Sequence, residues 1–260
     1  MLIDRFLTTD YLGSEIACFD VLESTNKSAR ELARVGYPTG TIVACDQQMG
    51  GRGRRDRRWV SDPGKCMLMS MILRPTIRPE LAPRYTIAAA VGVYRAMAMY
   101  CMHGVRIKWP NDLVMGRRKL AGILLDCSAS MSGINYLIIG IGLNVHNETF
   151  YGDLTDSAVS IFQATGVHVN RERVIANILN CSEPLFAMCE TDEGFSKLME
   201  EYKRASAIYG KRVSIVKTSG TYQGTVTGFD DIGRIEMELE NGEHALFDSG
   251  DFSLKYDFDA

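Results

Sequence analysis

The chain has 260 residues, of which 46% are hydrophobic and 23% are charged, and its formal net charge is −3. This composition is typical of a globular protein and excludes disorder along the whole chain. A slightly acidic chain also lacks the basic surplus that general nucleic-acid binding needs, so we expect no nucleic-acid partner.

The first residues show neither the basic start nor the apolar run of a secretory signal, and the longest apolar stretch, 136–145, is too short to span a bilayer. Seven cysteines occur singly without a C-x-x-C pair, and the four histidines are scattered. This pattern predicts reduced thiols and gives little support to a zinc site or a Ser-His-Asp hydrolase. We expect a cytoplasmic location and no membrane partner, and we nominate no metal-ligating residue.

The first part of the chain has the pattern of short apolar strands joined by two helices. Ser24, Thr25 and Asn26 are three possible N-caps for an amphipathic helix over 27–35. A longer helix, rich in Ala and Met, is predicted over 81–102, with its methionines in the core. The predicted strands are 16–21, 41–47, 66–73, 105–109, 113–115, 120–126 and 136–145, and a basic hairpin turn is predicted at 116–119.

The second part changes from helices to strands near residue 208. Helical patterns cover 157–166, 170–189 and 193–205, and Pro184 is expected to kink or end the second of these helices. Short alternating runs separated by turn residues follow at 212–217, 221–229, 234–239 and 244–248. We therefore predict an α+β protein with two domains, residues 1–207 and a small β-barrel over residues 208–260.

One loop concentrates unusual charge. The segment Gly50-Gly51-Arg52-Gly53-Arg54-Arg55-Asp56-Arg57-Arg58-Trp59 carries five arginines and one acid. Because glycine allows the backbone to approach a ligand closely, the amides and guanidinium groups of such a loop can converge on phosphate. Two other interpretations are a solvated basic turn and an arginine-glycine segment that binds nucleic acid.

Two further motifs follow this loop: Lys108-Trp109-Pro110-Asn111-Asp112 with Lys119-Leu120-Ala121-Gly122-Ile123-Leu124, and Gly140-Ile141-Gly142-Leu143-Asn144-Val145. Together with the loop they resemble the biotin protein ligases, and the resemblance covers roughly the whole chain from Ser24 onward. Three ordered motifs are far more specific than one. The chain departs from the family pattern at Met49-Gly50 and at Asp56, where a small residue, usually Gly, is commoner. Asp56 places a carboxylate among arginines that are expected to seek phosphate.

The resemblance implies a catalytic domain built on a mixed β-sheet packed with helices, followed by an SH3-like β-barrel. It implies a ligase that activates biotin with ATP to biotinyl-5'-AMP and transfers biotin to a lysine of a biotin carboxyl carrier domain of a carboxylase. The small molecules are then ATP, Mg²⁺ and biotin. Homodimers are common among the relatives, so a homodimer is a further expectation. No helix-turn-helix pattern precedes the catalytic motifs, so we expect a short form that does not bind operator DNA.

Activation of biotin brings a carboxylate and a triphosphate together, so the site must supply cations that hold both anions and stabilise the charge developing at the α-phosphorus. Lysine is a compact, movable point charge, whereas arginine is a planar bidentate clamp. One lysine on a strand, Lys119, with Arg52, Arg54 and Arg57 on a loop meets this need.

The resemblance assigns roles to individual residues. The expected catalytic residues are Lys119, Arg54 and Asp112. The residues expected to bind biotin are Ser24, Thr25, Asn26, Gln48, Gly51, Arg52, Lys119 and Gly122. The residues expected to bind ATP are Arg54, Arg57, Trp59, Asn111, Lys119 and Asn144, and Trp59 is expected to stack on adenine.

Alternatives stay open for two residues and for the function. Asp112 is either a turn residue after Pro-Asn or a polar group near Mg²⁺ and the attacking lysine. Asn144 either satisfies backbone groups at a strand end or contacts the nucleotide. A lipoate or octanoyl ligase would share the sheet and the lysine but gives no reason for an arginine loop that ends in Trp59. A nucleic-acid binder would spread Lys and Arg along one face, whereas the predicted helices and barrel are charge-mixed.

Overall fold

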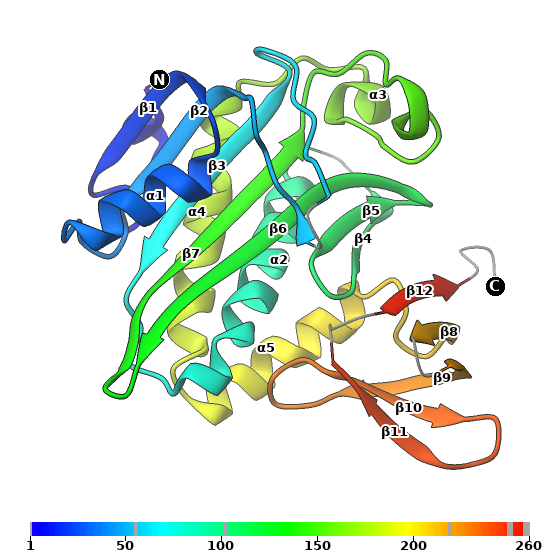
Figure 1. Ribbon diagram of the computed structural model, residues 1–260. Helices are drawn as coiled ribbons and strands as arrows, with labels where there is room; N and C mark the ends of the chain where they lie inside the picture. The colour runs from blue at the N-terminus through cyan, green and yellow to red at the C-terminus, as the bar shows by residue number, and fades with distance from the viewer. Residues whose placement is uncertain (1, 55–56, 101–102, 218–219, 249–251, 257–260) are drawn as a thin grey trace.

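The computed structural model describes residues 2–54, 57–100, 103–217, 220–248 and 252–256 (Figure 1). The expectation placed on Asp56 lies outside the described residues, as does the predicted end of the second helix at 101–102.

A seven-stranded mixed sheet forms the larger layer of the molecule (Figure 1). Among its described strands, β1 and β2 are parallel and the other neighbours are antiparallel. The predicted strands are confirmed, and the last two extend further than predicted to form a long hairpin. In spatial order the strands are β1 (Ile16–Leu22), β2 (Ile42–Gln48), β3 (Cys66–Leu73), β7 (Gly133–Asn144), β6 (Arg118–Ser130), β5 (Asp112–Met115) and β4 (Val105–Lys108).

Helices cover both faces of this sheet because successive side chains of a strand point to opposite sides. On one face, Met69, Met71 and Ile139 belong to the main core, which includes residues of α2 (Pro83–Ala98), α4 (Arg171–Met188) and α5 (Asp192–Ala205). On the other face, Val43, Ile72 and Ile138 pack against Ala29 and Ala33 of α1 (Thr25–Arg34). Figure 1 shows α1 in front of the sheet and α2 and α4 behind it. Since α1 is short, it leaves part of its face uncovered, and the candidate site lies there.

The C-terminal part is an antiparallel sheet, as predicted, but it is open. Its strand order is β11-β10-β9-β8-β12, and no ladder joins β11 to β12 within the described residues. The expected closed barrel is therefore not seen. The last strand was not predicted, because its run is short and follows a Ser-Gly-Asp segment. The strands are β8 (Arg212–Lys217), β9 (Gly220–Phe229), β10 (Ile235–Leu239), β11 (His244–Phe247) and β12 (Phe252–Tyr256).

Two buried side chains join the two parts of the molecule. Arg84 of α2 is 2% exposed; its Nε donates to Asp231 O at 2.9 Å, and its NH2 group lies 2.7 Å from Asp192 Oδ1. Trp109 Nε1 donates to Gly233 O at 2.7 Å. The turn between β9 and β10 is thus fixed to α2 and to the end of β4 by hydrogen bonds that are shielded from water.

The helix predicted over 157–166 is mostly wrong. Only α3 (Ile161–Thr165) is helical, with Ser160 and Gln163 forming a capping box. The residues before it pair with β6 instead, because Lys119 N donates to Ser157 O and Val159 N donates to Lys119 O, at 2.7 and 2.9 Å. Tertiary hydrogen bonds outweigh the local helical pattern here.

Pro184 does not end its helix. It lies inside α4, which continues to Met188. Near this proline α4 packs closely against α2, since a Cβ atom at Gly92 of α2 would lie 2.1 Å from Ser182 Oγ.

This close approach yields a stability prediction. Gly92→Ala should lower the free energy of unfolding by about 1–3 kcal/mol, because the added methyl group overpacks the contact between the helices. Ser182→Ala should be close to neutral, since Ser182 Oγ has no hydrogen-bond partner among the described residues. The double variant should recover part of the loss. Additive effects in urea unfolding would contradict the contact.

Candidate functional site

A pocket of about 480 Å³ opens on the face of the sheet that α1 covers in part. Every site residue nominated from the sequence lines this pocket, apart from Gly51, which lies just beneath it. Gly51 is buried, and a Cβ atom there would lie 2.7 Å from Trp59 O and 3.0 Å from Gln48 Nε2. The structure therefore brings the nominated residues together from four separate stretches of the chain.

The floor of the pocket is a row of glycines on two neighbouring strands, β6 and β7. Gly122 of β6 is paired with Gly142 of β7, and Gly142 is paired with Leu68 of β3. A Cβ atom at Gly142 would lie 2.6 Å from the Trp59 ring, and one at Gly122 would lie 3.0 Å from Lys119 Nζ. Side chains at these positions would fill the space that the indole and the ammonium group occupy, so glycine is required for close approach.

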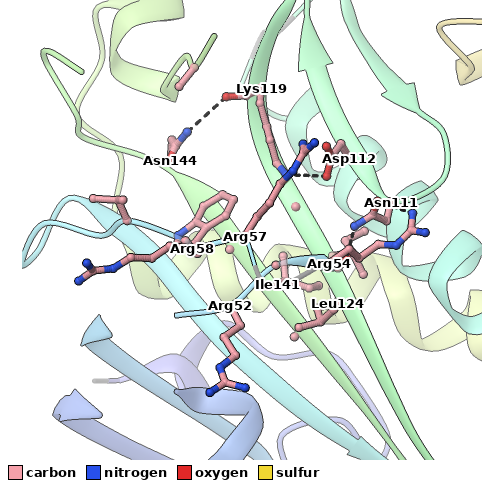
Figure 2. Close-up of a pocket in the computed structure, with 18 of the residues that line it drawn as sticks. Arg52, Arg54, Arg57, Arg58, Asn111, Asp112, Lys119, Leu124, Ile141 and Asn144 are labelled. Atoms are coloured by element: carbon pink, nitrogen blue, oxygen red, sulfur yellow. Dashed lines mark hydrogen bonds and ion pairs between the residues drawn. The ribbon is translucent and has the colours of Figure 1, made fainter. Parts of the chain in front are cut away.

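Lys119 lies near the start of β6, where its backbone is held on both sides by Ser157 and Val159. Its Nζ atom lies 2.7 Å from Asp112 Oδ1 and 5.5 Å from the centroid of the Trp59 ring (Figure 2). The ion pair is partly exposed, so solvent screens it and it is weak enough to exchange partners. The ammonium group is thus the movable part of a residue whose main chain is fixed.

The Pro-Asn-Asp turn leads into β5 and is fixed to β6. Asn111 Nδ2 donates to Ile123 O at 2.6 Å, and Ile123 N donates to Asn111 O at 2.8 Å. The Asn111 Oδ1 atom remains directed at the arginine loop, where Arg54 donates to it at 3.4 Å. Asp112 then enters β5 opposite Gly122. This local geometry places an amide and a carboxylate at the mouth of the pocket.

Asn144 is buried at the end of β7, where its Nδ2 donates to the carbonyls of Lys119 and Val159 at 3.3 and 3.2 Å. The expectation that Asn144 satisfies backbone groups at a strand end is therefore confirmed. It fixes the backbone that carries Lys119. A contact with nucleotide stays a prediction.

A chain of polar side chains runs under α1. Gln48 Oε1 accepts from Thr25 N at 2.7 Å and lies 3.1 Å from Thr25 Oγ1. Ser70 Oγ lies 2.7 Å from Thr25 Oγ1 and 2.6 Å from Asn26 Oδ1. Ser24 is at the N-cap position but makes no side-chain cap hydrogen bond. Thr25 and Asn26 lie inside the first turn of α1 and face the sheet, so they serve the pocket and not the helix end.

The arginine side chains of the loop point in two different directions. In Figure 2, Arg54 extends toward Asn111 and Arg57 toward Lys119 and Asp112, whereas Arg52 and Arg58 point away from that carboxylate. The loop closes on itself through Gly53 N, which donates to Arg57 O at 2.7 Å, and through a bridge between Arg52 and Arg58.

Trp59 ends the loop and lies against the glycine floor. Its ring also packs on the cluster of Cys45, Cys66 and Leu68. Its Nε1 atom is buried and has no hydrogen-bond partner among the described residues. A buried indole N–H usually has an acceptor, so this atom is open to one supplied by a ligand.

Sequence reasoning left several polar residues of this site without a nomination, and Ser70 and Lys108 are two of them. Ser70 is the single polar side chain in a fully buried strand of eight residues, and that interruption was the available signal. Lys108 lines the pocket beside Asp112, and its place in the Lys-Trp-Pro-Asn-Asp motif was the signal. Burial lowers the pKa of Lys108, the Asp112 carboxylate opposes this effect, and the positive charges of Lys119 and Arg57 add to it.

The described residues contain no group of three or more His, Cys, Asp or Glu side chains that could hold a metal ion. Asp112 is the one carboxylate among the described residues that line the pocket. A lone carboxylate suits Mg²⁺ that is bound mainly by phosphates, because Mg²⁺ keeps several waters and uses few protein ligands. No helix in the described residues is both long enough and apolar enough to cross a membrane.

Comparisons with known proteins agree with this geometry. A model of the biotin/lipoate A/B protein ligase family matches residues 18–144, and a model of the biotin protein ligase C-terminal domain matches residues 208–255. The bifunctional ligase/repressor BirA of Bacillus subtilis is 36% identical over 250 residues, which cover 95% of this chain and 76% of the relative. The biotin–[acetyl-CoA-carboxylase] ligase of Paracoccus denitrificans is 32% identical over 234 residues, which cover 86% of this chain and 94% of the relative. The solved structure of the biotin protein ligase from Aquifex aeolicus in complex with biotin and ATP matches with a TM-score of 0.79 and 25% identity. The match covers 94% of this chain and 99% of that structure's chain.

The glycine floor can be tested without any ligand. Gly142→Ala should displace the Trp59 ring by about 1 Å, because carbon atoms in contact prefer separations of about 3.5–4.0 Å. We expect a shifted tryptophan emission and stronger quenching by acrylamide. The change should disappear in a Trp59→Phe background, which retains Trp109. Identical emission with and without Gly142→Ala would contradict the contact.

Proposed function

The chain belongs to the biotin protein ligase family, and on that premise we propose how its residues divide the work of the reaction. In the first half-reaction, a biotin carboxylate oxygen attacks the α-phosphorus of ATP and pyrophosphate leaves. In the second, the amine of an acceptor lysine attacks the acyl carbon of biotinyl-5'-AMP, AMP leaves, and the amine loses a proton. The acceptor is a biotin carboxyl carrier domain of a carboxylase.

The observation that carries the proposal is the Lys119 ammonium, held 2.7 Å from Asp112 at the meeting point of floor, loop and turn. Its main chain is fixed and its charge is only loosely paired. When biotin and ATP arrive, their anions compete with Asp112 for Nζ. Lys119 would then lie between the biotin carboxylate and the α-phosphate, where its charge stabilises the transition state more than either ground state.

Two loop arginines serve the phosphates in this proposal. Arg54 and Arg57 extend toward the turn and the lysine, so their planar guanidinium groups can each clamp phosphoryl oxygens. Mg²⁺, which enters as the complex with ATP, would be held on the protein side by Asp112 and would supply charge neutralisation at the phosphates.

The polar chain under α1 would bind the head of biotin. Thr25, Asn26 and Gln48 offer hydrogen-bonding groups to the ureido ring, and Ser24 begins the same turn. Gly51, Arg52 and Gly122 would enclose the rest of biotin. The positions of the two glycines support this role, since Gly51 lies against Gln48 and Gly122 lies against Lys119.

The nucleotide would occupy the mouth of the pocket, with adenine stacked on Trp59. Stacking of a base on an aromatic ring is worth roughly 1–3 kcal/mol. The indole N–H, which has no partner in the described part of the chain, and the Asn111 Oδ1 atom are further polar groups at this end. Asn144 would act through the Lys119 backbone and contact the nucleotide from the floor.

Asp112 would change partners in the second half-reaction. Once Lys119 is engaged by the adenylate, the carboxylate can accept a hydrogen bond from the incoming acceptor lysine and orient its amine. The same carboxylate thus restrains Lys119 before catalysis and guides the acceptor after it.

The larger organisation completes the proposal. A boundary at 207/208 agrees with the start of the C-terminal family match at residue 208. The described cysteines are free thiols, in keeping with a cytoplasmic enzyme. A homodimer stays a prediction from the family resemblance.

The decisive experiment offers the protein MgATP, a carboxyl carrier domain, and either biotin or lipoate. We expect the mass of the acceptor to rise by one biotinyl group with biotin and to stay unchanged with lipoate. Modification by lipoate alone would replace this proposal with the lipoate-ligase alternative, which the comparisons do not favour.

Lys119→Ala should reduce pyrophosphate exchange by about a hundredfold or more, with a smaller loss of biotin affinity, because the lost charge acts mainly in the transition state. Lys65→Ala is the matched control: Lys65 is 40% exposed against 37% for Lys119 and is paired with Glu148 at 3.0 Å, outside the pocket. Exchange within a few-fold of the parent in Lys119→Ala would show that the catalytic role is wrong.

The arginine loop should retain the reactive adenylate. Its glycines make ordering costly, and its arginines repel one another until an anion arrives, so we expect it to order over the intermediate. Arg54→Gly should release biotinyl-5'-AMP about tenfold faster and label bystander lysines, since one charged hydrogen bond is lost.

Arg58→Gly adds the same flexibility at an arginine that points away from Asp112, so it separates charge from flexibility. Equal release from the Arg54 and Arg58 variants would contradict a specific role for Arg54. Asp56→Gly tests the expectation from sequence that Asp56 weakens retention: release should slow.

A further inference from the structure

The polar chain under α1 continues past the pocket to an acid that has no assigned role. Asn26 Nδ2 donates to Asp126 Oδ2 at 3.0 Å. Arg30 NH2 lies 2.7 Å from the same oxygen, and this ion pair is 39% exposed on the Arg30 side and 30% on the Asp126 side. Asp126 lies on β6, two residues beyond the pocket residue Leu124. A charged group therefore anchors the outer end of the hydrogen-bonded chain.

Asp126 determines which way the Asn26 amide points. An ionised carboxylate can only accept hydrogen bonds, so it requires the amide nitrogen and repels the amide oxygen. The carbonyl of Leu124, 3.5 Å from Nδ2, has the same requirement. With the nitrogen held there, Asn26 Oδ1 must face Ser70 and the space that Gly140 leaves, where a Cβ atom would lie 1.9 Å away.

The orientation of Asn26 then determines the donors further along. Ser70 has one hydroxyl hydrogen and two oxygen neighbours, Asn26 Oδ1 and Thr25 Oγ1. If Ser70 donates its hydrogen to Asn26 Oδ1, Ser70 Oγ is free to accept a hydrogen bond from the Thr25 hydroxyl. Gln48 Oε1 then still accepts from the backbone N–H of Thr25. If the amide were turned, Ser70 would donate to Thr25 and Thr25 would donate to Gln48. Two opposite arrangements of hydrogens thus exist, and the carboxylate selects one.

Burial makes this choice energetically important. Ser70, Thr25 and Asn26 are 0%, 3% and 7% exposed, so water cannot easily compensate a donor or acceptor that points the wrong way. The selected arrangement presents oxygen acceptors, Asn26 Oδ1 and Gln48 Oε1, in the pocket wall. A cyclic urea has two N–H donors, and acceptors are what those donors need.

We propose that Asp126, held by Arg30, is a positioning residue that fixes the hydrogen-bond direction of the Asn26–Ser70–Thr25–Gln48 chain and thereby the preference of the pocket for the ureido head of biotin. This inference rests on the proposed function. Asp126 acts through Asn26 and does not itself contact the substrate.

Asp126→Asn is the sharpest test because it keeps the shape and offers an amide that can either donate or accept. Both arrangements then become available. KM for biotin should rise about tenfold, the loss expected for one charged hydrogen bond, while KM for ATP and kcat stay within about twofold of the parent. Asp126→Glu, which restores the carboxylate, should recover most of the biotin affinity.

A second measurement reports hydrogen-bond direction and not stability. The parent should strongly prefer biotin over an analogue with one ureido N–H methylated, and Asp126→Asn should lose about tenfold of that preference. Glu201→Gln is the matched control, since the Arg95–Glu201 pair lies 2.5 Å apart with exposures of 40% and 24% and is remote from the pocket. Glu201→Gln can lower the Tm, but it should leave the biotin KM and the preference for biotin over the methylated analogue unchanged.

If Asp126→Asn does not fold, Ser70→Ala provides the same test, because Ser70 lies in the middle of the hydrogen-bonded chain. It also should raise the biotin KM without changing the ATP KM. An unchanged biotin KM and analogue preference in a folded variant, or the same changes in Glu201→Gln, would overturn the positioning role. If the parent itself fails to biotinylate the acceptor, the proposed function fails instead.

Discussion

The site depends on a sheet face that has almost no side chains at its centre. Gly122, Gly140 and Gly142 occupy positions where a β-carbon would collide with Lys119, Asn26 or Trp59. Three functional side chains approach the sheet only because the backbone beneath them is bare. The opposite face of the same sheet carries Met69, Met71 and Ile139 into a closely packed core. One face therefore supplies the stability and the other the space.

Much of this arrangement could be predicted because its signals are local. The apolar run of β3, the glycines of β7 and the arginine loop are contiguous segments whose chemistry can be read directly, and the ordered motifs indicated the family. The segment 157–160 could not be predicted, because its backbone hydrogen bonds go to Lys119, which lies about forty residues earlier in the chain. Asp126 was missed for a similar reason, and the signal for Ser70, one polar residue in an apolar run, did not reveal its role. Each has meaning only through a partner on another element, Asn26, and no sequence pattern records that contact.

Charge in the pocket is arranged in two separate systems. Lys119, Asp112, Arg57 and Lys108 form a partly exposed cluster of three cations around one carboxylate. In the Asn26–Ser70–Thr25–Gln48 chain the first three residues are buried, and the chain has one charged end at Asp126. The first system can rearrange when anions arrive, because solvent screens its pairs. The second resists rearrangement, because each hydrogen has a single good acceptor once the direction is set.

The hydrogen bond from Trp109 Nε1 to Gly233 O places a constraint on the C-terminal sheet that its own fold does not require. Trp109 directly precedes the Pro-Asn-Asp turn that carries Asn111 and Asp112. The carbonyl of Gly233, in the turn between β9 and β10, therefore holds the side chain of the residue from which that turn starts. Any domain exchanged for residues 208–260 would have to present a carbonyl at that same point in space, and not merely cover the same apolar surface. The C-terminal sheet in this sense helps to set the position of the Asp112 carboxylate, although none of its described residues line the pocket.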